Sequence, residues 1–321
     1  MKTSCSHMSS LVPSTSLASL KRRFIAPLLI SLVLPVLSSA STVLSFDFSR
    51  TTGDRNHYFG TSQPGGSFDN GNANLGFYVQ SGVLKSTNVN GGSSPSTYWA
   101  LVDDTDPDNI NVSAPSGNTA LKATSDTSIS MRTRITSLSS GDSGVVSQAG
   151  FLIGLSDTSS TASGWFFALQ RTPGSNSSSI LTVREFTNGL YGSTILSSST
   201  FTYAGAATFI DFSISDTGSY TFRLFDDTTI SGTGDSTTRL NSSDFGTVAA
   251  VSSISGTISD YTAGWQGVGF LDGGGTNVGA VNFGNFQMTY TSTIPEPAAA
   301  SLVLGVASFF MLAYRRRLER I

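Results

Sequence analysis

Strict alternation of apolar and polar residues is the feature that most limits what this chain can fold into. Positions 129–136 read Ile-Ser-Met-Arg-Thr-Arg-Ile-Thr, and positions 210–215 read Ile-Asp-Phe-Ser-Ile-Ser. A period of two places successive side chains on opposite faces of a β-strand. No stretch between positions 41 and 293 keeps a helical period. The sequence therefore predicts an all-β domain.

A turn and two apolar runs refine this prediction. Asp216-Thr217-Gly218 separates the run at 210–215 from a second alternating run at 220–224, so we predict a hairpin in which Gly218 supplies a positive φ. Residues 150–155 and 165–169 are apolar or glycine throughout, which is typical of central strands covered on both faces. A final strand is predicted at 286–290. About twelve strands with short connections predict a sandwich of two antiparallel sheets.

Residues 1–40 have the order of a secretory signal peptide. Basic residues 21–23 precede the apolar stretch 24–37, and small residues 38–40 follow, as a signal peptidase requires. We therefore predict cleavage by signal peptidase between Ala40 and Ser41. The alternative is a membrane anchor, but the apolar stretch is short for a bilayer and contains Pro27 and Pro35.

Residues 291–321 also carry a targeting pattern. The motif at 294–297, Ile-Pro-Glu-Pro, precedes an apolar run at 298–314 and an Arg-rich end at 315–320. A helix over this apolar run would be about 25 Å long, at the lower limit for the core of a bilayer. The arginines would hold the C-terminus on the cytoplasmic side. The sequence predicts a transmembrane helix over 298–314, which serves either as part of a sorting signal or as a plain anchor.

The order of motif, apolar helix and basic end resembles the PEP-CTERM sorting signal of Gram-negative bacteria. The resemblance covers residues 294–321, and its motif residues are Pro295, Glu296 and Pro297. It implies that an exosortase, a membrane-embedded cysteine transpeptidase, cleaves near this motif. It also implies that the product is released or attached at the cell surface, commonly in a biofilm or exopolysaccharide matrix. The three motif residues would be substrate residues without a catalytic role.

The exported part of the chain, residues 41–293, is acidic. Eight of the 18 basic and two of the 21 acidic residues lie outside it, which leaves a net charge of −9. A domain of this charge repels polyphosphate, so we expect no nucleic-acid partner. The single cysteine, Cys5, lies in the predicted signal peptide. A domain without a disulfide must be stabilised by its own core, and its length is ample for one.

The series of strands from about 42 to 290 resembles the concanavalin A-like lectin/glucanase and laminin-G-like sandwiches. The resemblance rests on a first strand, 43–48, that would pair beside the last one, with long strands between them. A generic jelly roll is the alternative. We therefore expect one β-sandwich over 41–290, between the signal peptide and the sorting signal.

The inventory of catalytic residues argues against an enzyme. The resemblance implies that retaining glycosidases of this type use two Glu residues on one strand, but Glu185 is the only Glu between 41 and 293. His57 is the only histidine there, and it is not accompanied by a nucleophile motif. One His and no Cys leave no ligand set for zinc. We expect no catalytic residue and no resident cofactor.

An acidic cluster at 103–109 is a candidate metal site. Asp104, Asp106 and Asp108 alternate, and carboxylate oxygens suit Ca²⁺. The EF-hand pattern fails, because Asn109 and Pro115 stand where that loop needs Gly and Glu. We expect a solvated acidic loop, with a Ca²⁺ site as the alternative.

Aromatic residues suggest a candidate ligand site. Trp99 flanks a Ser/Pro-rich loop beside the acidic cluster and is expected to be the exposed tryptophan, able to stack on a sugar ring, whereas Trp165 and Trp265 are expected in the core. Two functions remain open. One is a non-catalytic surface or matrix protein, and the other is a carbohydrate-binding module near Trp99 that binds polysaccharide.

Overall fold

The computed structural model describes a defined part of the chain, namely residues 40–46, 59–60, 77–80, 83–87, 96–102, 123, 125–139, 146–157, 161–171, 178–203, 205–272, 280–292, 310–311 and 315–316. The chain divides into two compact units, Ser41–Thr293 and the two ends Met1–Ala40 and Ile294–Ile321 taken together. The predicted signal peptide up to residue 39 and the motif at 294–297 lie outside the described residues. So does the predicted helix at 298–314, apart from two helical residues at 310–311. Among the residues that are described, no helix is long and apolar enough to cross a membrane.

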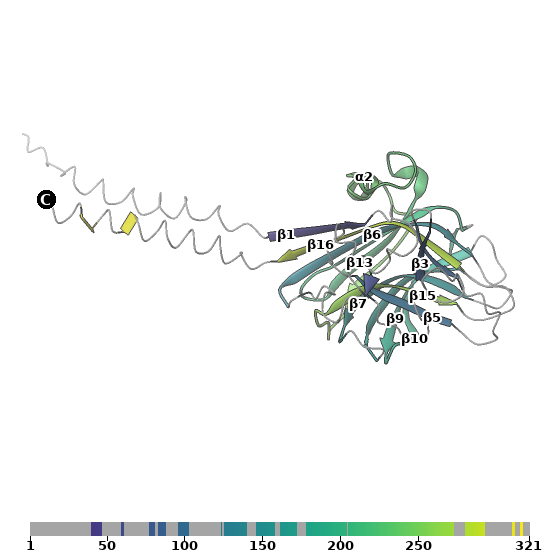
Figure 1. The fold of residues 1–321 in the computed structure, drawn as a ribbon, viewed down its shortest axis with the longest axis horizontal. Coiled ribbons are helices and arrows are strands. Elements are labelled where there is room, and N and C mark those ends of the chain that lie inside the picture. Colours follow the sequence, from purple (N-terminus) through teal and green to yellow (C-terminus); the bar gives the residue numbers. More distant parts are fainter. Residues whose placement is uncertain are drawn as a thin grey trace, which may run out of the picture. The chain divides into compact units, whose positions relative to one another are not determined.

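The Ser41–Thr293 unit contains two eight-stranded sheets (Figure 1). Sheet A has the order β14 (Ser252–Thr257), β13 (Ser219–Asp226), β12 (Thr208–Ile214), β6 (Thr127–Leu138), β16 (Ala280–Ser292), β4 (Val83–Thr87) and β3 (Phe77–Gln80), and β1 (Ala40–Phe46) also pairs with β16. Sheet B has the order β10 (Leu190–Ser197), β9 (Ser178–Thr187), β8 (Gly164–Arg171), β7 (Ser147–Leu155), β15 (Trp265–Asp272), β5 (Ser96–Val102) and β2 (Phe59–Gly60), and β11 (Phe201–Thr202) also pairs with β9. All strand pairs with a described register are antiparallel. The predicted all-β, two-sheet sandwich is confirmed.

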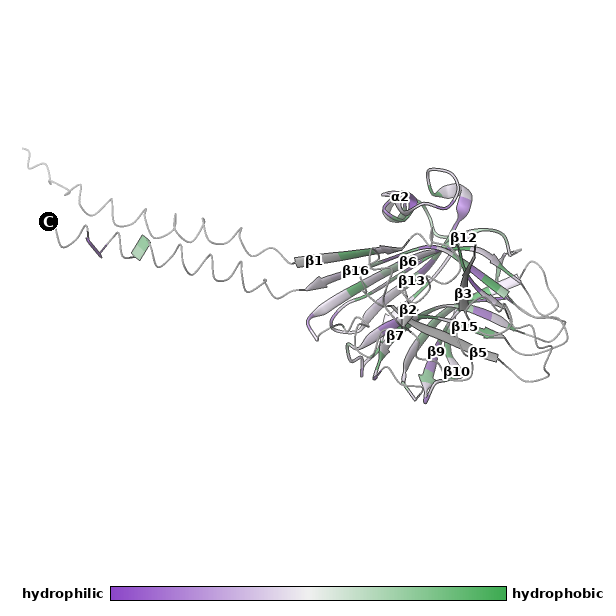
Figure 2. Ribbon diagram, in the orientation of Figure 1, coloured by the Kyte–Doolittle hydropathy of each residue, from purple (hydrophilic) through white to green (hydrophobic). Residues whose placement is uncertain are grey.

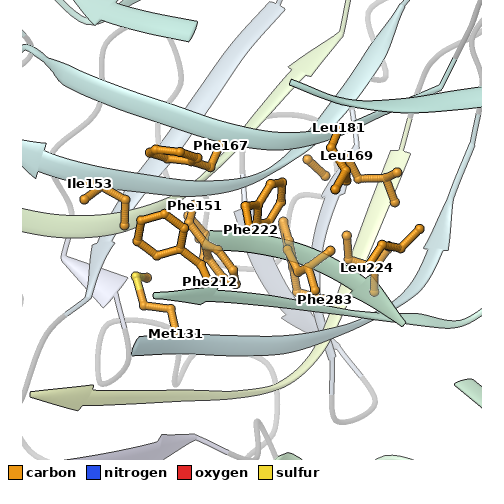
Figure 3. Close-up of a cluster of buried hydrophobic side chains, with 14 of the residues drawn as sticks. Met131, Phe151, Ile153, Phe167, Leu169, Leu181, Phe212, Phe222, Leu224 and Phe283 are labelled. Atoms are coloured by element: carbon orange, nitrogen blue, oxygen red, sulfur yellow. The ribbon is translucent and has the colours of Figure 1, made fainter. Parts of the chain in front are cut away.

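The core between the two sheets is rich in phenylalanine. Phe151 and Phe167 of sheet B meet Phe212 and Phe222 of sheet A, with ring centroids of Phe167 and Phe212 only 4.5 Å apart (Figure 3). Buried and half-buried residues alternate along β6 as the sequence predicts. The main apolar cluster lies within Ser41–Thr293. This unit therefore holds its own core, and we expect it to fold without the flanking segments.

Two local predictions are also confirmed. Strands β12 and β13 form the expected hairpin, and Gly218 in its turn has φ +83°. The first strand pairs with the last, β1 with β16, although β1 begins at Ala40 rather than at Val43. The structure has sixteen strands among the described residues rather than about twelve, because pieces as short as the two-residue strands β2 and β11 cannot show an alternating pattern.

Residues 227–250 form a small lobe on the outer face of sheet A that the sequence did not predict. It contains the 3₁₀ helix η3 (Asp227–Thr229) and two four-residue helices, α2 (Thr237–Leu240) and α3 (Asp244–Thr247). Its apolar side chains pack on Phe209 and Phe225 of the sheet. Figure 2 shows hydrophilic residues on this lobe beside α2. Helices of four residues are too short to show a helical period, so the pattern could not reveal them.

Asp227 anchors the lobe to β6. Nε and Nη2 of Arg134 donate to its two carboxylate oxygens at 2.7 and 2.9 Å, and Arg239 donates to the same carboxylate at 3.0 Å. The hydrogen bonds from Arg134, together with the charges of both arginines, hold the pKa of Asp227 below its usual value of 3.8.

We expect this ion pair to make stability depend on acid pH. Because the folded-state pKa of Asp227 is lowered, its contribution is complete above about pH 4 and is lost as the pH falls through the folded-state pKa. Urea unfolding between pH 7 and pH 2 should therefore show a steeper loss for the native chain than for Asp227→Asn. Identical slopes in the two proteins would contradict the assignment.

Candidate functional site

Sheet B has a second face, directed away from the core, which we call the outer face. Along β7 and β8, odd-numbered residues such as Phe151 and Phe167 enter the core, whereas even-numbered residues such as Leu152 and Phe166 belong to a separate apolar cluster on the opposite face. Along β15 the core residues are Val268 and Phe270, so the odd-numbered positions of β15 share the outer face.

A row of small residues crosses the middle of the outer face. Cross-strand pairing aligns Gly269 of β15 with Gly150 of β7, then Ala168 of β8 and Thr182 of β9. On the far side of β15, Trp99 of β5 takes the position opposite Gly269. Four adjacent strands, β15, β7, β8 and β9, thus contribute no large side chain to the middle of this face.

The outer face is concave. Tyr191, at the start of β10, lies over Gly269, and a Cβ at Gly269 would collide with its hydroxyl. Strand β10 is four strands away from β15, about 19 Å in a flat sheet, which is farther than a tyrosine side chain reaches. The sheet must therefore curl strongly to bring Tyr191 across. Strand β10 follows β9 through a hairpin turn at Asn188-Gly189. Both residues have positive φ, +52° and +74°, as a two-residue hairpin turn requires.

Tyr191 covers part of the outer face with its aromatic ring. Its ring lies 4.4 Å from that of Phe166 and 5.1 Å from that of Phe186, measured between centroids. Burial raises the pKa of Tyr191 well above its usual value of 10.0, an effect opposed by a hydrogen bond with the backbone of Phe270. The phenol is therefore a neutral group at physiological pH.

Polar groups without partners lie on the same face. Gln148 of β7 is fully buried, and neither its Oε1 nor its Nε2 has a hydrogen-bond partner. Gln170 lies directly across from it on β8, and its buried Oε1 also has no partner. Buried polar atoms are almost always paired in folded proteins, because an unpaired one costs about 1–3 kcal/mol. The outer face thus offers amide acceptors and donors that the described chain does not satisfy.

Arg184 of β9 adds a cation to the outer face. It aligns with Phe166 across β8 and β9, and its Nη1 donates to the carbonyl of Gly192 at 2.9 Å. Its Nε is buried without a partner. Burial lowers the pKa of Arg184, and among the described residues no carboxylate opposes this shift.

The residues predicted as a site from the sequence are only partly described. Asp104, Asp106 and Asp108 lie outside the described residues, as do Pro295, Glu296 and Pro297. Within the described residues, no group of three or more His, Cys, Asp or Glu side chains is arranged for a metal ion. Trp99 lies on β5, beside the small-residue row, although only its backbone position is described. The predicted cleavage site falls at the first residues of β1, and Ser41 is exposed there.

Two other predicted roles can be located. Both tryptophans pack against buried apolar clusters, as expected. Trp165 packs against the main core, and Trp265, which shares the odd-numbered register of Gly269, packs against the second buried cluster on the outer face. Glu185 is exposed and aligns with Trp165, so it belongs to the other register from Arg184. His57 lies outside the described residues.

Gln148, Gln170 and Arg184 were not predicted as site residues. A signal existed for the two glutamines, because each lies near the end of a strand that is otherwise mostly apolar, Ser147–Leu155 and Gly164–Arg171. Arg184 lies in Ser178–Thr187, where polar residues are common and one more does not stand out. A polar side chain in a strand covered on both faces needs a partner, and the sequence offered none nearby.

The sequence matches no protein-family model and no curated protein. Among solved structures, the CBM2 module of the evolved Dit protein of Lactobacillus casei phage J-1 aligns with 79% of this chain and 98% of its own length, at 12% identity and a TM-score of 0.46. The legume lectin-like domain from Entamoeba histolytica covers 76% of this chain and 95% of its own, at 8% identity and a TM-score of 0.42. A family 7 alginate lyase, A1-II′, covers 68% and 83%, at 11% identity and a TM-score of 0.40. All three TM-scores are below 0.5, so we base the function proposed below on the residues of this chain alone.

Proposed function

We propose that this protein is an exported, non-catalytic carbohydrate-binding protein whose ligand site is the outer face of sheet B. The observation that carries the proposal is the buried, unpartnered amide of Gln148 beside that of Gln170. A carboxamide offers an acceptor and two donors in one plane, and sugar hydroxyls both donate and accept. Tyr191 lies over the small-residue row at Gly269, and Trp99 takes the backbone position opposite Gly269 on β5; aromatic residues of this kind are the usual stacking partners of sugar rings.

We propose a delivery route from the two ends of the sequence. Signal peptidase removes residues 1–40, and an exosortase acts near Pro295, Glu296 and Pro297 after the 298–314 helix has held the chain in the membrane. The product is displayed at the cell surface or in the extracellular matrix of a Gram-negative bacterium. Intact-mass measurement of the mature protein tests this route, because termini other than Ser41 and a residue near the motif would contradict it.

Gln148 gives a sharp test of the site. Gln148→Met keeps the side-chain volume but removes two buried atoms without partners, so we expect the free energy of unfolding to rise by about 1–2 kcal/mol. Glycan binding should fall at least tenfold, as measured on a glycan array and by calorimetry, with and without Ca²⁺. A substitution that raises stability and lowers binding identifies Gln148 as a residue that binds ligand. A residue with a purely structural role would lose stability instead.

Gln266 provides the matched control. It is equally buried, but its Nε2 donates to the Gly264 carbonyl at 2.7 Å and its Oε1 accepts from the Tyr290 hydroxyl at 2.7 Å. Gln266→Met should therefore lose about 1–3 kcal/mol of stability and keep its glycan binding. Destabilisation of both variants would assign Gln148 a structural role.

The second candidate function is a passive matrix protein that binds no ligand. The chain between residues 41 and 293 has few charged residues and long stretches rich in Ser and Thr. Such a composition suits a hydrated surface coat. No binding across the glycan array, with or without Ca²⁺, would favour this function. Loss of binding in Trp99→Ala would favour the carbohydrate site.

A further inference from the structure

Arg184 differs from the arginines of sheet A and of the 227–250 lobe in its lack of a counter-charge. Arg132, Arg134, Arg223 and Arg239 each lie 2.6–3.0 Å from a carboxylate oxygen. No carboxylate of the described chain pairs with Arg184, although its Nε is buried. Partial burial of a guanidinium without an anion carries an unfavourable free energy, which a bound anion would reduce.

Two donors on one edge of the Arg184 guanidinium have no hydrogen-bond partner in the described chain. Nη1 donates to the carbonyl of Gly192, a residue that lies where the β9–β10 pairing shifts register between Tyr191 and Thr194. Nε has no partner, and no hydrogen bond of Nη2 is found in the described chain. The Nε and Nη2 donors are parallel, and this edge matches the two oxygens of a carboxylate.

The spacing of the polar groups defines the length of the ligand. Arg184 pairs with Phe166 of β8, and Gln170 lies four residues further along the same strand. The guanidinium and the amides are therefore about 13 Å apart along the strand direction. Ala168 and Thr182 lie between these positions, in the row of small residues. A ligand that reaches both the amides and the guanidinium must therefore be longer than one sugar ring.

We propose that the outer face of sheet B binds acidic polysaccharide, with the carboxylate of a uronic acid at Arg184 and the hydroxyls of a neighbouring sugar at Gln148 and Gln170. This inference rests on the proposed carbohydrate-binding function. It assigns the site a ligand of opposite charge even though the exported domain as a whole is acidic. The binding is therefore local recognition by one guanidinium, without steering by the overall charge.

Oligogalacturonate and its methyl ester are a suitable pair of probes, because they share the sugar chain and differ in the charge of the carboxyl group. Calorimetry on the full chain and on Ser41–Thr293 should show at least about tenfold tighter binding of the acid, the amount expected for a hydrogen bond to a charged group. Arg184→Gln should remove this preference, because it takes away the positive charge that distinguishes the acid from the ester.

Two further variants keep the test decisive. Lys85→Gln removes one positive charge from β4 of sheet A and should retain the full preference for the acid. Arg184→Lys keeps the charge but not the paired donors, so it should retain only part of the preference. Equal affinity of the native protein for acid and ester would overturn the acidic-ligand inference while the carbohydrate-binding function stands. Absence of binding to either probe, and to the neutral glycans of the array, would overturn both.

Discussion

Gly150→Ala is expected to lower the free energy of unfolding by at least about 3 kcal/mol. A Cβ at this position would overlap the Phe167 carbonyl oxygen and lie 2.7 Å from the Ala168 Cα. Both atoms belong to the backbone of β8, which pairs with β7 over seven residue pairs. The backbone cannot move away without breaking that ladder, so the added methyl group must separate two central strands of sheet B. Chemical unfolding of Ser41–Thr293, followed by circular dichroism, measures the effect.

Gly269→Ala is the matched control in the same row of small residues. The Cβ there would meet only side chains, the Tyr191 hydroxyl and Phe166 Cε2 at 2.9 Å. Since side chains can rotate, the cost should stay near 1–2 kcal/mol, and Tyr191 should leave the outer face. The two substitutions add the same methyl group, so equal stability losses would show that the β7–β8 approach is not rigid.

Asp211→Ala is the second change with a large expected effect. Asp211 lies on β12 between Arg132 of β6 and Arg223 of β13, in register with both. Its Oδ1 accepts from Arg132 at 2.6 Å, and its Oδ2 accepts two hydrogen bonds from Arg223 at 2.6 and 2.9 Å. The carboxylate is only 3% exposed. Its removal leaves two guanidinium groups facing each other across one strand.

We expect this substitution to lower the free energy of unfolding by about 3 kcal/mol, at the lower end for a broken buried ion pair. The two arginine side chains remain 25% and 30% exposed, and water will stabilise them in part. Arg132 also donates to the Leu240 carbonyl at 3.0 Å and stacks on Phe245 at 4.4 Å, so hydrogen exchange should increase in the 227–250 lobe. The exposed Asp260→Asn is the control, with an expected change below about 0.5 kcal/mol. A change of that size in Asp211→Ala would contradict the ion-pair argument.

The sequence predicts this fold best where one face of a strand is buried in the core and the other face is exposed to solvent. Strands β6 and β13 follow that rule, so their alternation reveals both the strands and their core residues. Gly218 was predicted because a hairpin turn needs a positive φ that glycine adopts freely. The 227–250 lobe escaped prediction because its stability comes from packing and from Arg239 hydrogen bonds, neither of which has a local period.

The candidate site was harder to predict because it depends on cross-strand register. Gly150, Ala168 and Gly269 are far apart in the sequence, and only the pairing of β15, β7 and β8 places them in one row. The sequence instead indicated the acidic residues at 103–109 and Trp99 as candidate site residues, because their residue types stand out without knowledge of the fold. Trp99 does fall beside that row. Gln148 and Arg184 could be recognised as candidate ligand-binding residues only from the structure, which shows that neighbouring residues do not satisfy their polar atoms.

The pairing of the first strand with the last has a mechanical consequence. β1 and β16 lie side by side and run in opposite directions, so the start of β1 and the end of β16 lie at the same end of sheet A (Figure 1). Tension applied beyond Ser292 acts along β16, whose ladder with β6 extends from Val281 to Ser292. Hydrogen bonds perpendicular to the strands share such a load in shear, instead of opening one after another. A polymer held on sheet B would thus pull against sheet A through the packed phenylalanine core, and the sandwich would resist that pull as one rigid link.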